Sequence, residues 1–251
     1  MKKFILLLIG FAFLRVDLSA QAMENTGISE DSYQAINFSL NTKNMHLWRG
    51  YKVSNNAMTA LDANYVTRNE KLKVGLWNGI SFDGTYTEFD YYVSYSFNNK
   101  WNLSVWDINN FSDYPGANIF NYSRETTSHF VDATLAFNAT DKLALSWSTI
   151  LAGRDFYRDD NNEVKGSFSN FVEARYQALK VNQTTVGLFV GGAFSFQNEA
   201  HFYGSSPGIV NFGLTLAKEV NVLGGVIPVS AMAMWNPEQN YGAMQIQIGI
   251  F

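Results

Sequence analysis

The residues that could carry out chemistry are few and lie far apart in the sequence. His46, His129 and His201 are the three histidines, and none belongs to an H-E-x-x-H or similarly paired metal motif. The segment GSSPG at 204–208 fits the G-x-S-x-G pattern of a serine nucleophile. That motif requires a strand, a sharp turn and a helix, but here a proline and a strand-like pattern follow the serine. We therefore expect no catalytic residue, no metal site and no cofactor.

A second group of polar side chains is more informative, because most of its members recur at alternate positions of otherwise apolar segments. A basic side chain turned towards hydrocarbon at mid-depth in a membrane costs about 2–4 kcal/mol, and an acidic one somewhat less. Charges that share one phase of such segments therefore indicate the inner face of a barrel, where they would line a pore. The residues are Arg49 near one mouth and Asp62, Glu88, Asp90, Tyr92, Asp132, Glu173, Arg175, Gln245 and Gln247.

The elements that position these residues follow from a period of two, which is typical of β-strands and persists along most of the chain. Helical spacing is not sustained in any window. The pattern predicts about twelve strands, most of them close to the ~9–11 residues that a tilted strand needs to cross a bilayer. The predicted strands lie near 33–49, 59–67, 71–80, 87–97, 101–111, 128–137, 142–153, 167–179, 184–196, 209–219, 226–235 and 241–251.

The connections between these segments alternate between two kinds. Those after the even-numbered strands are short, such as 68–70 and 98–100, whereas those after the odd-numbered strands are longer, such as 112–127, 154–166 and 197–208. A soluble sandwich has no reason to alternate in this way. A membrane barrel has tight turns at its periplasmic rim and long loops at its outer rim. The fold class we predict is all-β, a closed antiparallel up-and-down transmembrane barrel.

The C-terminal segment QIQIGIF at 245–251 supports closure of the sheet. Backbone groups in lipid must all be paired, so the last strand should pair with the first. Ile246, Ile248 and Ile250 would then face acyl chains. Phe251 resembles the terminal signal that the barrel-assembly machinery recognises, although it lies on the opposite phase from the isoleucines. The expected partners are this machinery and outer-membrane lipid.

The N-terminal segment has the features of a Sec-type signal peptide. Met1-Lys2-Lys3 is followed by an apolar run that Arg15 and Asp17 end, and then by Ala20-Gln21-Ala22. We predict a signal peptide at 1–22, a single barrel domain at 23–251 and location in a bacterial outer membrane. The chain has no cysteine to carry a lipid. A nucleic-acid partner is not expected, because the formal net charge is −4.

Several short motifs in the first third of the chain resemble the TorF-like family of outer-membrane porins, also described as a bacterial family of unknown function. They are Trp48-Arg49-Gly50, Gly75-Leu76-Trp77 and the set Glu88, Asp90, Tyr92 and Tyr95, with Ser94 where that family has glycine. The similarity covers roughly residues 33–97. It implies a porin-like protein and brings no catalytic residues.

The sequence thus favours a narrow channel for small polar or cationic solutes. We hypothesise that Arg49 pairs with Glu88 or Asp90 and sets the narrowest point, and that the acidic excess favours cations. Two alternatives stay open: a barrel hydrolase or acyltransferase, and a structural or adhesive barrel that acts through the loops at 112–127 and 154–166. The solute, the oligomeric state and the position of the loop at 112–127 do not follow from the sequence.

Overall fold

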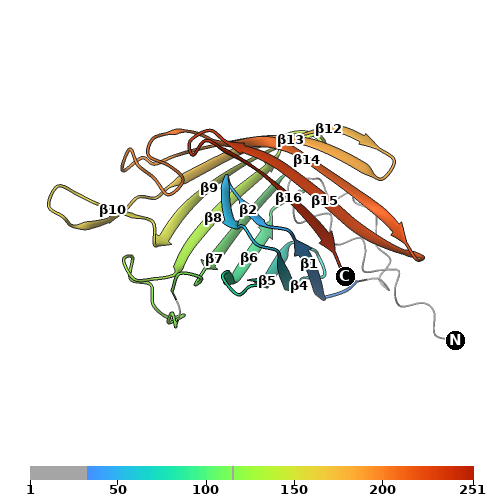
Figure 1. Ribbon diagram of the computed structural model, residues 1–251, viewed down its shortest axis with the longest axis horizontal. Helices are drawn as coiled ribbons and strands as arrows, with labels where there is room; N and C mark the ends of the chain where they lie inside the picture. The colour runs from blue at the N-terminus through green and yellow to red at the C-terminus, as the bar shows by residue number, and fades with distance from the viewer. Residues whose placement is uncertain (1–32, 115) are drawn as a thin grey trace.

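The computed structural model describes residues 33–114 and 116–251. The predicted signal peptide lies outside these residues. Within them the chain forms β-strands and no α-helix, and no helix is long and apolar enough to cross a membrane. Figure 1 shows the strands inclined across the molecule, with the loop that carries β10 at one end and the C-terminus towards the other.

Among the described residues, twelve strands form one closed antiparallel barrel, as the sequence predicts. Each wall strand pairs with its neighbours along the chain, apart from the short hairpins described below, so the topology is up-and-down. The wall consists of β1 (Ile36–Lys43), β4 (Met58–Val66), β5 (Leu72–Ser81), β6 (Thr87–Ser96), β7 (Trp101–Asn109), β8 (His129–Asn138), β9 (Leu143–Gly153), β12 (Asn170–Val181), β13 (Thr184–Phe194), β14 (Gly208–Val222), β15 (Gly225–Asn236) and β16 (Tyr241–Gly249).

The seam between β1 and β16 closes the barrel. Thr42 lies opposite Ile248, flanked by the pairs Asn41–Gly249 and Lys43–Gln247. The backbone of Leu40 extends the seam, because its N–H donates to Phe251 (3.1 Å) and its carbonyl accepts from Ile250 (2.8 Å). The C-terminal strand therefore has the position that its alternating pattern predicted.

The predicted first strand at 33–49 is wrong in its second half. β1 ends at Lys43, and the chain then turns into a separate hairpin made of β2 (His46–Trp48) and β3 (Tyr51–Ser54). Arg49 and Gly50 form its turn with φ values of 45° and 89°. The alternating pattern runs through both elements because a hairpin strand also has two faces, so the period alone does not locate the break. A second short hairpin, β10 (Phe156–Arg158) and β11 (Val164–Gly166), lies in the loop between β9 and β12.

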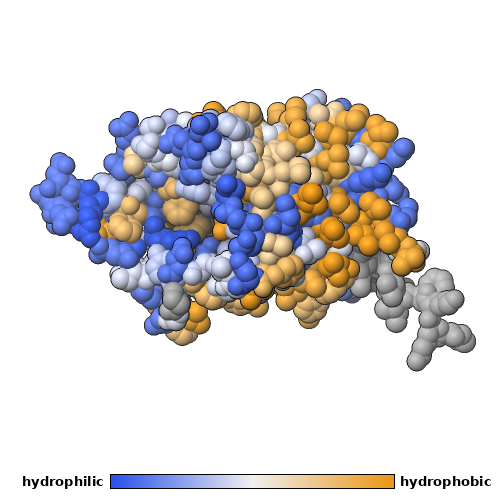
Figure 2. Space-filling model, viewed as in Figure 1, coloured by the Kyte–Doolittle hydropathy of each residue, from blue (hydrophilic) through white to orange (hydrophobic). Residues whose placement is uncertain are grey.

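The two faces of the wall differ as the alternation predicts. Leu76, Leu214 and Ile246 point outwards and are 40–46% exposed, whereas Asp90 and Asp132 point inwards and are 4% and 2% exposed. Figure 2 shows hydrophobic residues over the middle and right of the molecule and hydrophilic residues at the left, where the long loops lie. The outer surface is therefore apolar along the strands and polar at the loop end.

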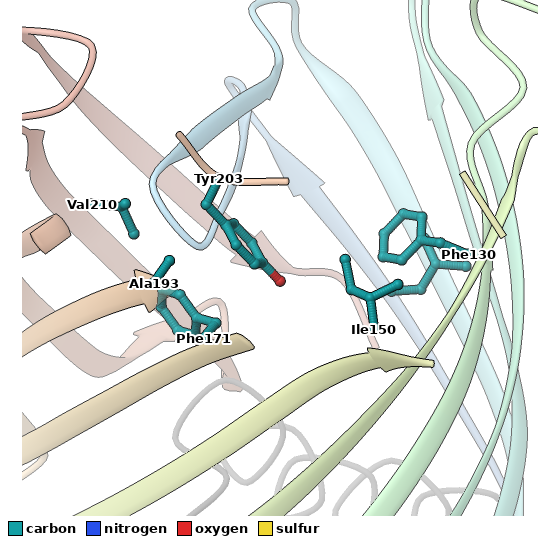
Figure 3. Close-up of a cluster of buried hydrophobic side chains, with 7 residues drawn as sticks. Phe130, Ile150, Phe171, Ala193, Tyr203 and Val210 are labelled. Carbon is teal, nitrogen blue, oxygen red and sulfur yellow. The ribbon is translucent and has the colours of Figure 1, made fainter. Parts of the chain in front are cut away.

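The interior is partly filled near the loop end of the barrel. Tyr203, in the loop between β13 and β14, lies between wall residues such as Phe171 and Ile150 (Figure 3). Trp48 and Tyr51 of the β2–β3 hairpin pack against the same cluster. This loop and the hairpin together form an internal plug that narrows the lumen.

The seam gives a direct test of closure. Opposed residues of antiparallel strands have Cα atoms about 4.5–5.5 Å apart, within the range that a disulfide spans. The chain has no cysteine of its own, so the double variant Thr42→Cys/Ile248→Cys should form an intramolecular disulfide on oxidation, seen as a mobility shift that reductant reverses. The pair Thr42→Cys/Met244→Cys, offset by roughly 13 Å along the strand, should not. Equal crosslinking of both pairs would contradict the seam.

Candidate functional site

The β2–β3 hairpin enters the barrel at the β1–β4 junction and is fixed to the wall on the β15–β16 side. The carbonyl of Gly50 accepts hydrogen bonds from Asn236 Nδ2 (3.0 Å) and Tyr241 Oη (2.5 Å). The N–H of Leu47 donates to Gln245 Oε1 at 2.9 Å. Glycine is required at the turn, because a Cβ on Gly50 would lie 2.6 Å from the carbonyl oxygen of Val210.

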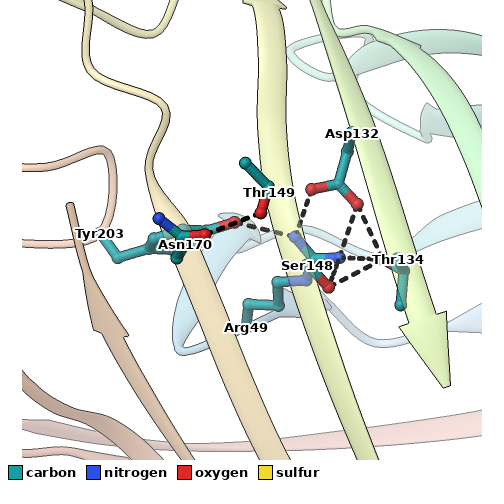
Figure 4. A network of polar contacts seen from close by, with 7 residues as sticks. All are labelled: Arg49, Asp132, Thr134, Ser148, Thr149, Asn170 and Tyr203. Carbon is teal, nitrogen blue, oxygen red and sulfur yellow. Dashed lines mark hydrogen bonds and ion pairs between the residues drawn. The ribbon is translucent and has the colours of Figure 1, made fainter. Parts of the chain in front are cut away.

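The tip of the hairpin places Arg49 against the far wall, on β8 and β9 (Figure 4). Its two terminal nitrogens each donate to one carboxylate oxygen of Asp132, at 2.8 Å. The same nitrogens donate to Tyr203 Oη (2.8 Å), Ser148 Oγ (2.8 Å) and Thr134 Oγ1 (3.1 Å). This bidentate geometry is the strong form of an arginine–carboxylate contact. Arg49 therefore links the hairpin, two wall strands and the β13–β14 loop.

Aromatic rings enclose this ion pair. The guanidinium carbon of Arg49 lies 4.7 Å from the ring centroid of Trp48 and 5.3 Å from that of Phe171. Asp132 is buried, so its charge would be costly without the arginine. The hydroxyl of Tyr51 donates to the carbonyl of Phe202, and burial raises the pKa of Tyr51 to about 12, which keeps this donor protonated. The plug is held by several buried polar contacts as well as by packing.

A cavity of about 720 Å³ lies alongside the plug. Its lining includes residues near the long loops, such as Asp113 and Arg154, and residues far along the strands, such as Asn102 and Ser230. The cavity therefore reaches from the long-loop end past the hairpin into the half of the barrel nearer the short turns. Of the predicted residues it touches Arg49, Glu88, Asp90, Asp132, Glu173, Arg175 and Gln245.

The hypothesis that Arg49 pairs with Glu88 or Asp90 is wrong, because its partner is Asp132. Glu88 and Asp90 lie on β6, whereas the hairpin extends across the lumen to β8 and β9. Strand parity assigns a side chain to the inner or outer face. It does not say which inward residues meet across a closed barrel, so the partner could not be found from the period.

The other predicted residues form smaller groups on the inner face. Asp62 accepts from Tyr92 Oη at 2.9 and 3.1 Å and from Asn64 Nδ2 at 2.6 Å. Glu173 and Arg175 form an ion pair at 2.5 Å. Gln247 does not line the cavity; its side chain donates to Asn41 at the seam, at 3.2 Å. These contacts stabilise the inner wall, and Asp62 and Tyr92 also lie outside the cavity lining.

Several residues of the site were not identified from the sequence. Ser148 and Thr134 are short polar residues on the inward phase and differ from many others only in lying beneath Arg49. Tyr203 comes from a loop whose inward path has no periodic signal. The aromatic-Arg-Gly motif at 48–50 was the one clue to the turn, since an arginine followed by glycine in a strand-like run suits a sharp reversal.

The serine–histidine pair that an enzyme would need does not have a suitable geometry. A ring nitrogen of His201, Nε2, contacts the backbone carbonyl of Ser206 at 3.0 Å, and Nδ1 accepts from the N–H of Tyr203 at 3.2 Å. Both nitrogens are thus engaged by backbone rather than by a hydroxyl. In the part of the chain that the structure describes, no three His, Cys, Asp or Glu residues cluster closely enough to hold a metal ion.

Comparisons with known proteins give structural likeness only. No family model and no curated protein sequence matches the chain. Among solved structures, the NanC porin is similar with a TM-score of 0.48 and 9% identity over 84% of this chain and 97% of that chain. The Rh. blastica porin has a TM-score of 0.39 and 10% identity, over 87% and 74%. OpdK of Pseudomonas aeruginosa has a TM-score of 0.36 and 11% identity, over 87% and 66%.

The Arg49–Asp132 pair allows a test of its contribution to stability. Arg49→Met leaves a buried carboxylate without its partner and should lower the free energy of unfolding by about 3–5 kcal/mol. The double variant Arg49→Met/Asp132→Leu removes both charges, and its free energy of unfolding should fall clearly less. Urea unfolding of the refolded protein in detergent micelles, followed by tryptophan fluorescence, measures both. A double variant as unstable as the single one would show that packing, and not the ion pair, holds the hairpin.

Proposed function

We propose that the protein is an outer-membrane channel that lets small polar or cationic solutes pass through the cavity beside the plug. The observation that carries this proposal is a closed barrel whose outward side chains are apolar and exposed, while charged and polar side chains line its cavity together with aromatic and aliphatic ones. A soluble protein buries its apolar face, and this one exposes it around the barrel. A closed sheet with that surface suits lipid, because every wall strand is paired on both sides.

The exposed aromatic residues also support a membrane position. At the turn end, Tyr65, Trp101 and Tyr176 are 39–47% exposed, and at the loop end Phe82 and Trp235 are 68% and 41% exposed. Aromatic side chains at both ends of an apolar band are typical of transmembrane barrels, where they lie at the two interfaces.

The charge along the cavity favours cations. Arg49 and Arg175 are each matched by an acidic neighbour, Asp132 and Glu173. Glu88 and Asp90 line the same cavity and form no ion pair within residues 33–114 and 116–251. Unmatched carboxylates in a narrow water-filled passage attract cations and repel anions. The solute class is therefore small, polar and neutral or positively charged.

The ion pair gives a test of conduction, because neutralising its two members should change the ion selectivity in opposite directions. Arg49→Gln and Asp132→Asn both release the hairpin tip, so both should raise single-channel conductance in planar bilayers. Arg49→Gln leaves a free carboxylate and should increase the preference for K⁺ over Cl⁻. Asp132→Asn leaves a free guanidinium and should decrease it. Asp160→Asn, on an exposed loop, is the control. Absence of conductance from the refolded parent protein across a range of salt concentrations would refute the channel.

Neighbouring residues of β14 test the membrane position. Leu214 faces outwards and Thr215 lines the cavity. Leu214→Lys would place a charge in hydrocarbon and should destabilise the barrel in lipid vesicles by about 2–4 kcal/mol, measured by urea unfolding. Thr215→Lys places the same charge in the lumen and should cost much less. Similar losses for the two variants would mean that the outer face does not contact lipid.

A further inference from the structure

The wall formed by β5 and β6 carries two carboxylates beside aromatic rings, away from the Arg49 contact. In the register of these strands Asp90 lies opposite Trp77, and Glu88 lies opposite Gly79. Glu88 and Asp90 are 6% and 4% exposed, and both line the cavity. They stand at the start of β6, near the outer mouth, where a solute entering from the loop end would meet them early.

Within residues 33–114 and 116–251, no cationic side chain forms an ion pair with Glu88 or Asp90. Asp90 accepts a hydrogen bond from the N–H of Asn109 at 2.9 Å, which leaves part of its carboxylate unused. Arg154 is the cationic side chain whose charge acts on Glu88. Its guanidinium, however, lies over the ring of Phe130, 5.3 Å from the centroid, and forms no ion pair with Glu88 in the described chain. Burying a carboxylate charge without a cationic partner is unfavourable in free energy. A bound cation would supply such a partner, so this wall is suited to a cationic ligand.

Two further buried polar atoms belong to the residues packed around Trp77. Tyr86 Oη and His46 Nδ1 are buried and form no hydrogen bond within the described residues. Tyr86 lies one residue before β6 and two before Glu88, and burial, followed by the charges of Glu88 and Asp90, raises the pKa of its hydroxyl. Burial, followed by the charge of Lys43, lowers the pKa of His46 well below its usual range. The imidazole is therefore neutral and adds no positive charge.

Three aromatic rings pack together next to this wall. Trp77 stacks on His46 with centroids 5.6 Å apart and an angle of 27°, and Tyr86 lies 5.8 Å from His46. The rings of Trp77 and Tyr86 occupy the space over Gly79, since a Cβ there would lie 2.5 Å and 2.9 Å from them. An indole beside carboxylates attracts cations. His46 covers one face of Trp77, and the indole also lines the cavity.

The number of oxygen atoms at this wall also distinguishes between a metal ion and an organic cation. Calcium takes 6–8 oxygen ligands, and the described residues hold no cluster that could bind a metal. A primary ammonium has three N–H donors and needs only a few acceptors. Glu88, Asp90 and the Tyr86 oxygen can supply these acceptors, and the Trp77 ring can contact the adjoining carbon chain.

We propose that Glu88, Asp90, Tyr86 and Trp77 form a binding subsite for the primary ammonium group of a small organic cation. The inference deepens the proposed function and rests on it in one respect, because the solute must reach the subsite through the cavity. Recognition lies in the two carboxylates, which replace the hydration of the ammonium, and the rings exclude water around its carbon chain.

The experiment uses 1,4-diaminobutane and its neutral counterpart 1,4-butanediol as probes. Isothermal titration calorimetry of the refolded protein in detergent micelles measures binding without any need for conduction. The diamine should bind and the diol should not. Glu88→Gln and Asp90→Asn should each lower the affinity for the diamine by at least about tenfold, as expected when a charged hydrogen-bond acceptor is neutralised. Glu88→Asp keeps the charge and should retain more affinity than Glu88→Gln, and Asp160→Asn should bind like the parent.

Circular dichroism and heat-dependent gel mobility establish that each variant is folded before it is titrated. No binding by the parent protein, equal binding of diol and diamine, or full affinity in both neutral variants would overturn the subsite. Displacement of the diamine by an equal concentration of Mg²⁺ would overturn it too, because the site would then select charge alone. Binding without conductance would refute the channel and leave the subsite standing, whereas conductance without binding would do the reverse.

Discussion

The closing seam between β1 and β16 is the constraint on which the rest of the structure depends. It is short, because the register pairs only Asn41 to Lys43 with β16, extended by the two hydrogen bonds at Leu40. Without it both strands would present unpaired edges, which hydrocarbon does not tolerate and which promote aggregation in water. Closure also separates an inside from an outside, and so gives the alternating side chains two distinct environments.

The internal plug follows from this closure. A hairpin that leaves the wall at the β1–β4 junction can reach β8 and β9 only because the sheet curves round to bring them opposite. Arg49 then places a charge beside the buried carboxylate of Asp132, and the direct contact offsets the cost of burying both charges. Tyr203 and Trp48 complete the enclosure. The hairpin thus occupies part of the lumen, and the cavity beside it is lined by the Arg49–Asp132 ion pair and by Glu88 and Asp90.

Most of the fold could be predicted from the sequence, and only part of the site. Segments such as 87–97 and 184–196 agree with β6 and β13 to within two residues, because an apolar outer face and a more polar inner face impose a strict period of two. The inward placement of Asp90, Asp132 and Gln245 follows from the same period. The first strand was predicted too long because a period of two does not distinguish a wall strand from a hairpin strand inside it. The resemblance to the TorF-like family stays a prediction.

Local alternation and turn length are recorded in the amino-acid sequence, and for that reason the sequence predicts the closed all-β barrel, its number of wall strands and the face that most wall side chains take. The contact of Arg49 with Asp132, the entry of Tyr203 into the lumen and the lack of an ion pair at Glu88 and Asp90 within residues 33–114 and 116–251 follow from the folded sheet alone. These contacts join residues 83 and 154 positions apart in the chain. They depend on the curvature and register of the whole sheet, which no local pattern records.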